Sequence, residues 1–435
     1  MKGLVDTINQ ETERVFMIGV QLKADNAWCV EESMDELAEL VTTAGAQVVG
    51  RGSQRLDKFN AATFIGPGKA KEFSEECKLA KVDTVVFDEE LNPAQGRNLE
   101  KIFECKILDR TALILDIFSQ RAQTREGKLQ VELAQLNHLL PRLTRFWTHL
   151  SRQKGGIGMR GGEGESQLEV DRRKVRERIG KIQRDLELVM RNRDVQRSGR
   201  KRNQWPLGSM VGYTNAGKST LFNAVTGAAT LSEDKLFATL DPTTRRLKLP
   251  TNQNVLLSDT VGFIRKLPHD LVDAFKATLE EVIEADLLLH VVDVSSPYAE
   301  EQIEAVNLVL GELGVEEKRT LMVFNKIDRI SSSGLSKRFT DKYSNSIAVS
   351  AKTGEGFSEF MAELGKQLRP VRQMVEISIP HSKSNVIARL HEVGQVLERN
   401  YDGEEAFFKA LIPPNYFDYF ESYIMVENEI IKPGF

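Results

Sequence analysis

Cysteine is scarce in this chain, which has only Cys29, Cys77 and Cys105 among its 435 residues. Three widely separated cysteines fit neither a zinc-ligand spacing nor a disulfide framework, so we expect reduced side chains used in packing. No apolar run approaches the roughly 18 residues of a membrane-spanning helix, and the first residues lack the apolar core of a signal peptide. The composition argues against secreted, zinc-ribbon and membrane-spanning classes. It favours a cytoplasmic protein with no transmembrane segment.

A strong net charge is also missing, because 59 Lys and Arg face 63 Asp and Glu and leave a net charge of −4. The balance hides a local excess. Residues 171–202 hold thirteen basic and five acidic residues, a local charge of +8 that leaves about −12 on the rest of the chain. Residues 371–435 hold six basic and ten acidic residues. This asymmetry indicates an RNA partner for the middle of the chain and a protein contact for its C-terminal part.

Glycine clusters where one motif requires it. Residues 212–219 read GYTNAGKS, the G-x-x-x-x-G-K-S phosphate-binding loop. The apolar run Leu207–Val211 precedes it and an amphipathic helix is expected from Ser219, which is the strand, loop and helix order that the motif needs. Loop amides and the helix N-terminus would bind phosphate, Lys218 would reach the β- and γ-phosphates, and the Ser219 hydroxyl would bind Mg²⁺. The predicted phosphate-binding residues are Gly212, Tyr213, Thr214, Asn215, Ala216, Gly217, Lys218 and Ser219.

A second motif, NKID, follows the apolar run Leu321–Phe324 and is therefore expected at the carboxyl end of a parallel strand. The Asp328 carboxylate has only acceptors, which match the adjacent N1–H and 2-amino donors of guanine and do not match adenine. Two charge-assisted hydrogen bonds of about 1.5–3 kcal/mol each would discriminate between these bases by on the order of a hundredfold or more. Lys326 is expected to lay its methylenes on the base, and Asn325 to tie this loop to the phosphate loop. The predicted guanine-binding residues are Asn325, Lys326, Ile327 and Asp328, with Ser350, Ala351 and Lys352 of a SAK sequence, where a backbone amide would meet the guanine O6.

Two segments between these motifs are expected to act as nucleotide switches. DTVG follows the apolar run Val255–Ser258; its Asp would hold Mg²⁺ through water and its Gly amide would meet the γ-phosphate. FATLD lies in a segment of switch-loop character. Thr239 is our choice for the second protein ligand of Mg²⁺, and spacing does not exclude Thr243 or Thr244. The predicted switch I is Phe237, Ala238, Thr239, Leu240 and Asp241, and the predicted switch II is Asp259, Thr260, Val261 and Gly262.

These five motifs, in this order, resemble the domain of translation-factor-class P-loop GTPases. The strings GYTNAGKSTLFN, FATLD, DTVGFIRKLPHDLV and NKID, with GGEGESQLEVDRR upstream, resemble the HflX-type family of ribosome-associated GTPases over nearly the whole chain. The resemblance implies a GTP-hydrolysing enzyme that binds the large ribosomal subunit and rescues or splits stalled ribosomes. It also implies that the N-terminal domain and a hairpin tip reach ribosomal RNA.

Residues 10–118 alternate short apolar strands with helical stretches, which predicts a small parallel α/β domain. The segment Phe64–Lys69 superficially resembles a phosphate loop but lacks its four-residue spacer and its Ser or Thr. We interpret it as a turn and a helix start, with an anion or RNA-phosphate contact as the alternative. Strands are expected at Phe16–Val20, Gln47–Val49, Thr84–Phe87 and Lys106–Leu108, and helices at Ser33–Ala44, Lys69–Ala80 and Pro93–Phe103.

Apolar residues step by three and four from Leu129 to Leu150, and mostly so from Leu168 to Val189. Two such stripes around one loop predict an antiparallel helical hairpin, which Pro141 should kink or divide. The tip at residues 151–164 has six glycines and three basic residues against one acidic residue, which suits close approach to a phosphate backbone. A solvated coiled coil that only joins two domains is the alternative. The RNA-contacting candidates are Arg152, Lys154 and Arg160.

The expected fold class is therefore α/β, with four parts. They are an N-terminal α/β domain (1–118), the helical hairpin with its tip and a basic linker (119–203), a GTPase domain with a mostly parallel sheet and helices on both faces (204–370), and a small α+β domain (371–435). In the last part we expect a strand at Val375–Ile379, a helix at Asn385–Asn400 and a strand at Ala406–Ile412, followed by a short helix and strand. A monomer is expected.

Hydrolysis raises one difficulty, because Phe263 follows Gly262 where many GTPases have a Gln that orients the attacking water. We expect slow intrinsic turnover that a ribosomal partner stimulates. Asn215 resembles the residue with which some GTPases recruit K⁺ beside the phosphates, where a cation can replace an arginine's charge. A role for Asn215 in bracing the loop is the alternative. The expected cofactors are Mg²⁺ and, as a hypothesis, K⁺.

Two further functional hypotheses stay open. The chain could be a regulatory GTPase that times the action of a protein or membrane-protein partner, which its acidic net charge fits. It could also remodel RNA with ATP bound to the N-terminal domain, although no complete second nucleotide motif is present.

Overall fold

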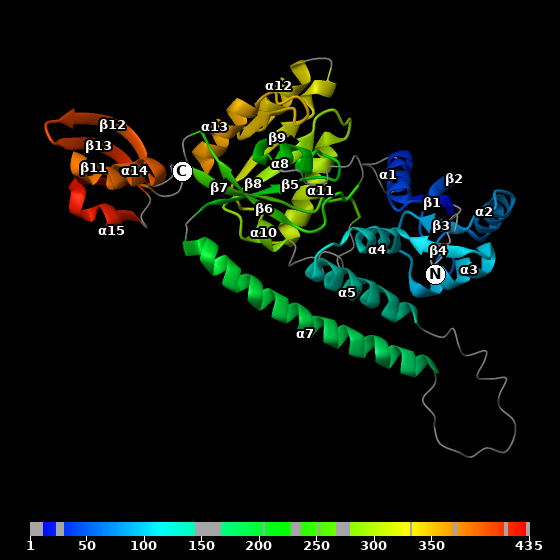
Figure 1. Ribbon diagram of the computed structural model, residues 1–435. Coiled ribbons are helices and arrows are strands. Elements are labelled where there is room, and N and C mark those ends of the chain that lie inside the picture. Colours follow the sequence, from blue (N-terminus) through cyan, green and yellow to red (C-terminus); the bar gives the residue numbers. More distant parts are fainter. Residues whose placement is uncertain are drawn as a thin grey trace, which may run out of the picture. The chain divides into compact units, whose positions relative to one another are not determined.

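The computed structural model describes residues 12–22, 30–143, 167–202, 205–227, 236–250, 253–266, 279–330, 333–368, 372–412 and 416–431 (Figure 1). Contacts between Cα atoms divide the chain into two compact units. The first holds Met1–Leu188, Lys235–Phe237 and Lys266–Phe275, and the second holds the remainder. The chain therefore passes from one unit to the other next to both predicted switches, after Phe237 and after Arg265. The four-domain division stays a prediction.

The first unit contains a four-stranded parallel sheet in the order β2-β1-β3-β4. Every strand and helix expected from residues 10–118 is present, and Phe64–Lys69 is a turn that leads into α2, as predicted. A further helix, α4, was not expected; it begins after Asp109, whose side chain caps it. The elements are β1 (Arg14–Leu22), α1 (Val30–Thr43), β2 (Gln47–Leu56), α2 (Pro67–Leu79), β3 (Thr84–Phe87), α3 (Pro93–Phe103), β4 (Lys106–Asp109) and α4 (Arg110–Arg121).

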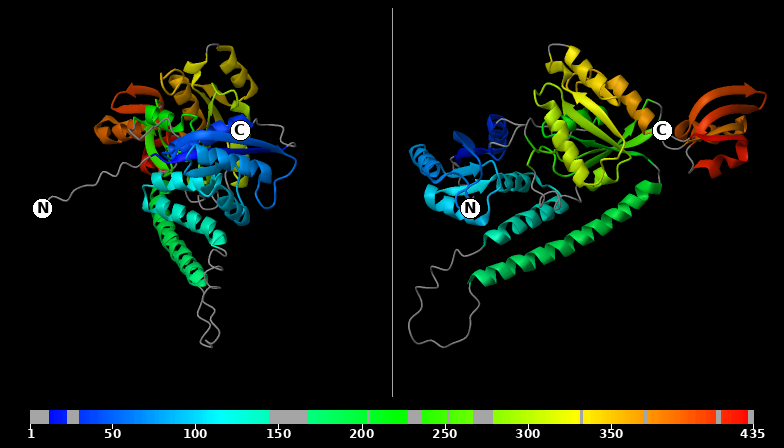
Figure 2. Two further views of the ribbon diagram at one scale, coloured as in Figure 1. Left: turned by 90° about the vertical axis from the view of Figure 1, so that its right-hand side faces the viewer. Right: turned by 180° about the vertical axis from the view of Figure 1, so that it is seen from behind.

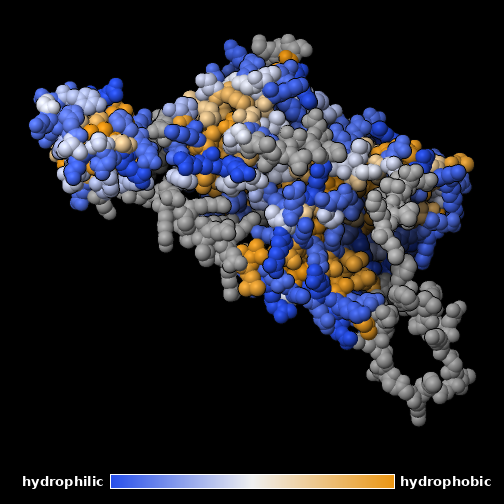
Figure 3. All heavy atoms as spheres, viewed as in Figure 1, coloured by the Kyte–Doolittle hydropathy of each residue, from blue (hydrophilic) through white to orange (hydrophobic). Residues whose placement is uncertain are grey.

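Two long helices, α5 (Arg125–Arg142) and α7 (Gln167–Arg202), run alongside each other in each view (Figures 1 and 2). The Arg178 guanidinium donates two hydrogen bonds of 2.6 and 2.7 Å to the Glu132 carboxylate and joins them. The helix α5 ends one residue after Pro141, and the tip with Arg152, Lys154 and Arg160 lies outside the described residues. Apolar side chains at Leu139 and Leu188 remain exposed among polar ones, and Figure 3 shows this mixture over both helices.

The basic stretch that we expect to link the hairpin to the GTPase domain has a regular conformation. It is helical and belongs to α7, which continues to Arg202. The physical reason is local: this stretch contains no proline before Pro206 and is rich in Arg and Lys, which favour helices.

The second unit contains a six-stranded sheet in the order β10-β9-β8-β5-β7-β6, parallel except for β6. Its residues alternate between two cores: Val291 packs in a cluster with residues of α8 and α13, and Val292 packs in a cluster with residues of α11 and α12. Helices therefore cover both faces, as predicted. The elements are β5 (Leu207–Val211), α8 (Lys218–Thr226), β6 (Thr243–Lys248), β7 (Asn254–Asp259), α10 (Glu280–Ile283), β8 (Leu287–Asp293), α11 (Ala299–Glu312), β9 (Thr320–Asn325), α12 (Ser333–Lys342), β10 (Ser346–Ala348) and α13 (Phe357–Gln367).

The C-terminal region forms an antiparallel sheet in the order β12-β13-β11-β14, and one expectation there is wrong. The helix expected at Asn385–Asn400 ends at Val393, and the residues after Gly394 form a strand. That strand pairs with its successor through a turn at Gly403-Glu404, where Gly403 has φ 58°. Glycine at the first central position of a tight turn, preceded here by Asp402, is a hairpin signal, and it explains the strand. The elements are β11 (Arg372–Pro380), α14 (Ser384–Val393), β12 (Gln395–Asp402), β13 (Glu405–Ile412), α15 (Phe417–Phe420) and β14 (Ile424–Ile431).

Among the described helices, none combines the length and the apolar composition that crossing a membrane requires.

Candidate nucleotide-binding site

The phosphate loop joins β5 to α8 and is pressed against its neighbours. Gly212 has φ 148° and Gly217 has φ 91°, both in the range that side chains disfavour. A Cβ atom at Gly212 would lie 2.2 Å from the Val291 carbonyl oxygen, and one at Gly217 would lie 2.3 Å from Asn325 Nδ2. Only glycine fits at either position, so the motif glycines set how closely the loop approaches β8 and the NKID segment.

Lys218 opens α8 with its ammonium group inside the loop. The Nζ atom donates to the carbonyl oxygens of Gly212 and Tyr213 at 3.1 and 2.8 Å. Burial lowers the pKa of Lys218 to about 8, and the charge of Lys326 acts in the same direction while Asp259 opposes it. An anionic phosphate beside this nitrogen would favour the charged form, so the environment suits a polyphosphate ligand.

Three oxygen-bearing side chains converge next to Lys218. Ser219 Oγ lies 2.6 Å from Asp259 Oδ2 and 2.8 Å from Thr239 Oγ1, and Thr239 Oγ1 lies 2.9 Å from the same carboxylate oxygen. The alternatives to Thr239 belong to β6: Thr243 is the cross-strand partner of Asp259 in β7, and the Thr244 hydroxyl faces Ser258 at 3.4 Å. The structure therefore brings together the three residues that the sequence nominated for Mg²⁺.

The chemistry of this trio fits a hard divalent cation. Asp259 Oδ1 is buried and has no hydrogen-bond partner within the described part of the chain. Burial raises the pKa of Asp259, against the Ser219 and Thr239 hydroxyl donors and the charge of Lys218. A cation beside the carboxylate would favour its ionised form and use the unpartnered oxygen, and hydroxyl and carboxylate oxygens are ligands that Mg²⁺ accepts.

Asn325 holds three loops together at the end of β9. Its Nδ2 donates to the Ala216 carbonyl oxygen at 2.8 Å, and its Oδ1 accepts from the Ala351 amide at 2.9 Å. This is the predicted tie between the base loop and the phosphate loop, and it extends to the SAK segment. Asp328 accepts from the Ser350 hydroxyl at 2.7 Å, which orients its carboxylate. The Ser350 amide is already bonded to the Glu355 carbonyl, which leaves Lys352 as the candidate amide for guanine O6.

Lys326 contacts Asp293, a residue that the sequence analysis missed. Its Nζ donates to the Asn215 carbonyl oxygen at 2.7 Å and pairs with the Asp293 carboxylate, also at 2.7 Å. The side chain is therefore held across the phosphate loop, where its methylenes would face a base. Asp293 ends β8, and an Asp at the end of an apolar run was the available signal.

The second switch is tied to the phosphate loop by its main chain. The Phe263 amide donates to the Gly212 carbonyl at 3.1 Å, and the Phe263 carbonyl accepts from the Thr214 amide at 2.7 Å. A Cβ atom at Gly262 would lie 3.0 Å from Lys218 Nζ, so this glycine lies directly against the Lys218 ammonium group. The Phe263 ring is 2% exposed, so position 263 contributes main-chain bonds here and no polar side chain.

These contacts define a P-loop GTPase site, and comparisons with known proteins agree. Family models match residues 31–119 (GTP-binding GTPase N-terminal), 121–200 (GTP-binding GTPase Middle Region), 208–326 (50S ribosome-binding GTPase) and 335–407 (HflX C-terminal domain). The chain is 48% identical to GTPase HflX of Magnetococcus marinus over 94% of both chains. It is 47% identical to GTPase HflX of Escherichia coli over 86% of this chain and 88% of that one.

The chain belongs to the HflX family of GTPases. Among solved structures it is similar to a GTP-binding protein from the archaeon Sulfolobus solfataricus in complex with GDP. That similarity covers 82% of this chain and 98% of the other, at 24% identity and a TM-score of 0.43.

Proposed function

We propose that the site binds GTP and GDP with Mg²⁺ through the residues predicted from the sequence. The phosphate loop and Lys218 bind the phosphates, Ser219 and Thr239 bind the metal directly, and Asp259 binds it through water. The metal would neutralise charge on the β- and γ-phosphate oxygens. Asp328 reads the guanine edge, and the Gly262 amide senses the γ-phosphate. The buried, unpartnered Asp259 oxygen is the single observation that most supports this proposal.

Changing Asp328→Asn tests the base assignment. The substitution replaces an acceptor pair with one acceptor and one donor, so GTP affinity should fall on the order of a hundredfold, while xanthosine triphosphate, whose C2 oxygen accepts, should gain affinity. Calorimetric titration of the purified chain with both nucleotides measures this. Asp341→Asn, on the exposed side of α12, serves as the control. Unchanged GTP affinity in Asp328→Asn would contradict the assignment.

We also propose that the GTP-bound protein binds the large ribosomal subunit and rescues or splits stalled ribosomes, and that hydrolysis releases it. Support comes from the family description of residues 208–326 and from the basic excess in residues 171–202. The buried Phe263 supports slow intrinsic turnover that the ribosome stimulates, since no side chain there can orient water. Sedimentation with ribosomal subunits tests the proposal: co-migration with a non-hydrolysable GTP analogue and not with GDP is expected. Absence of nucleotide-dependent co-migration would favour a timer that acts on another partner.

A further inference from the structure

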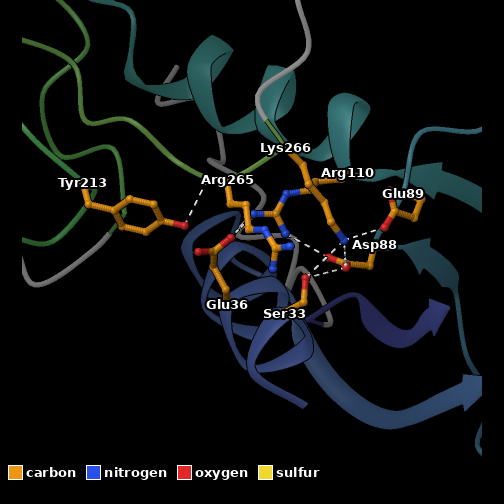
Figure 4. Close-up of polar contacts among 8 residues, drawn as sticks. All are labelled: Ser33, Glu36, Asp88, Glu89, Arg110, Tyr213, Arg265 and Lys266. Atoms are coloured by element: carbon orange, nitrogen blue, oxygen red, sulfur yellow. Dashed lines mark hydrogen bonds and ion pairs between the residues drawn. The ribbon is translucent and has the colours of Figure 1, made fainter. Parts of the chain in front are cut away.

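Lys266 lies four residues after Gly262 and contacts an acidic cluster of the N-terminal sheet. Its Nζ lies 2.5 Å from Asp88 Oδ2, 2.6 Å from Glu89 Oε1 and 3.3 Å from Ser33 Oγ. Figure 4 shows the ammonium group directed between the two carboxylates, which follow β3. All four residues belong to the first compact unit. This ion pair therefore fixes the segment that follows switch II to the N-terminal domain.

The residues around Lys266 form a largely buried cluster with several hydrogen bonds to one another, not an isolated ion pair on the surface. Asp88 is 3% exposed and also accepts from Arg110 at 2.9 Å and from Ser33 at 2.6 Å. Arg110 is 2% exposed and pairs in addition with Glu36. The Lys266 ammonium group brings a positive charge against two of these carboxylates, Asp88 and Glu89. Because removing one partner of a buried ion pair is costly, the cluster favours Lys266 at this place.

Switch I has a comparable contact with the N-terminal domain, and we call Lys266 and Phe237 the anchors of the two switches. Phe237 is 2% exposed and its ring meets that of Phe118 in α4 edge to face, with centroids 4.7 Å apart and an interplanar angle of 80°. It lies two residues before Thr239. Phe237 and Lys266 both have φ 55°, a left-handed backbone that such residues adopt only where their surroundings hold them.

Residues next to each anchor also contact the nucleotide site. The Arg265 amide, directly before Lys266, donates to the Tyr213 hydroxyl of the phosphate loop at 3.0 Å. Phe263 is paired with Gly212 and Thr214, and Thr239 meets Ser219 and Asp259. Each switch is thus fixed at one end by the phosphate loop or metal site and at the other by the N-terminal domain.

We propose that Lys266 and Phe237 are positioning residues through which the N-terminal domain holds both switches in the arrangement that receives the γ-phosphate. The proposal rests on the proposed roles of Thr239 and Gly262. Because these two residues serve the γ-phosphate, the anchors should strengthen binding of GTP and leave binding of GDP unchanged. By linkage, bound GTP strengthens the contact between Lys266 and the acidic cluster by the same factor.

The test compares affinities of the full-length chain for GDP and for a non-hydrolysable GTP analogue. Lys266→Met should weaken the analogue about tenfold, within the usual range of coupling between sites, and leave GDP affinity unchanged. Lys266→Arg keeps the charge and should remain near the wild-type values. Lys342→Met is the matched control. Lys342 belongs to α12, away from the switches in sequence, and its ammonium group pairs with the Glu300 carboxylate at 2.8 Å.

A double variant makes the test specific for the ion pair. Glu89 is 28% exposed on its side chain, whereas Asp88 is 4% exposed, and Gln has nearly the same size and shape as Glu, so Glu89→Gln should fold. Added to Lys266→Met, it should cause no further loss of analogue affinity, because the pair is already broken. Phe118→Leu, which alters the other anchor from the N-terminal side, should also weaken the analogue selectively.

The outcomes separate this inference from the function on which it depends. If wild-type protein binds neither nucleotide, the proposed function fails. If wild-type protein binds both and Lys266→Met binds both equally well, or loses GDP and analogue affinity in parallel, only the anchoring proposal is overturned. Additive losses in the double variant would overturn the ion pair as the cause.

Discussion

His290 lies in the middle of the GTPase sheet, in β8, where it is 1% exposed and its Nδ1 has no hydrogen-bond partner among the described residues. Burial lowers the pKa of His290 to about 3, and the charge of Lys218 contributes. The unfolded chain binds a proton near pH 6.5 and the folded chain does not. The stability that this group contributes is therefore complete above pH 6.5 and falls as the pH drops toward 3.

Replacing His290→Met removes that titration. Between pH 7 and pH 5 the wild-type opening free energy of β8 should fall by about 2 kcal/mol more than that of the variant, since each unit of pH below the unfolded pKa costs about 1.4 kcal/mol. Hydrogen exchange of the β8 amides at the two pH values measures this locally. The exposed His381→Gln is the control. Equal pH dependence in wild type and His290→Met would show that the buried imidazole is not the cause.

At the scale of an element, the phosphate loop carries the K⁺ hypothesis. Asn215 has φ 60° and is exposed, and its main-chain oxygen, not its side chain, accepts the bond from Lys326. Bracing by the main chain leaves the side-chain amide for a cation, and we propose that it binds K⁺ beside the phosphates. Turnover at constant ionic strength should then be on the order of tenfold faster in K⁺ than in Na⁺, and Asn215→Ala should abolish the difference. Equal rates in both salts would end the hypothesis.

The elements that the sequence predicted are those with a local signal. Strands such as Leu207–Val211 end in motif residues, and α2 starts at a proline after a glycine. β12 was mistaken for helix because its pairing with β13 decides its conformation, and only Asp402-Gly403 marked that pairing locally. The pair of Lys266 and Asp88 joins residues 178 positions apart, and no local pattern encodes such a contact. Motif residues could therefore be named from sequence, whereas the anchors of the switches could not.

At the scale of the whole molecule, charge separates two kinds of surface. The nucleotide motifs lie in residues 212–352, and the basic excess lies in residues 171–202, next to the glycine-rich tip. A protein that binds RNA with one region and nucleotide with another should lose these activities independently. The C-terminal part, with ten acidic and six basic residues, should contribute little to RNA binding.

Neutralising Arg152, Lys154 and Arg160 together tests this separation. Co-sedimentation with the large subunit in the presence of the GTP analogue should weaken, and the slope of log affinity against log salt should fall by about two to three, because each lost phosphate contact removes roughly one released counterion. GTP affinity should not change, since these positions lie outside the nucleotide motifs. Neutralising Lys383, Arg389 and Arg399 in the C-terminal region removes the same charge and should leave both activities intact. Loss of GTP binding in the tip variant would show that the RNA-binding and nucleotide-binding regions are not separate. An unchanged salt slope would show that the tip does not contact RNA.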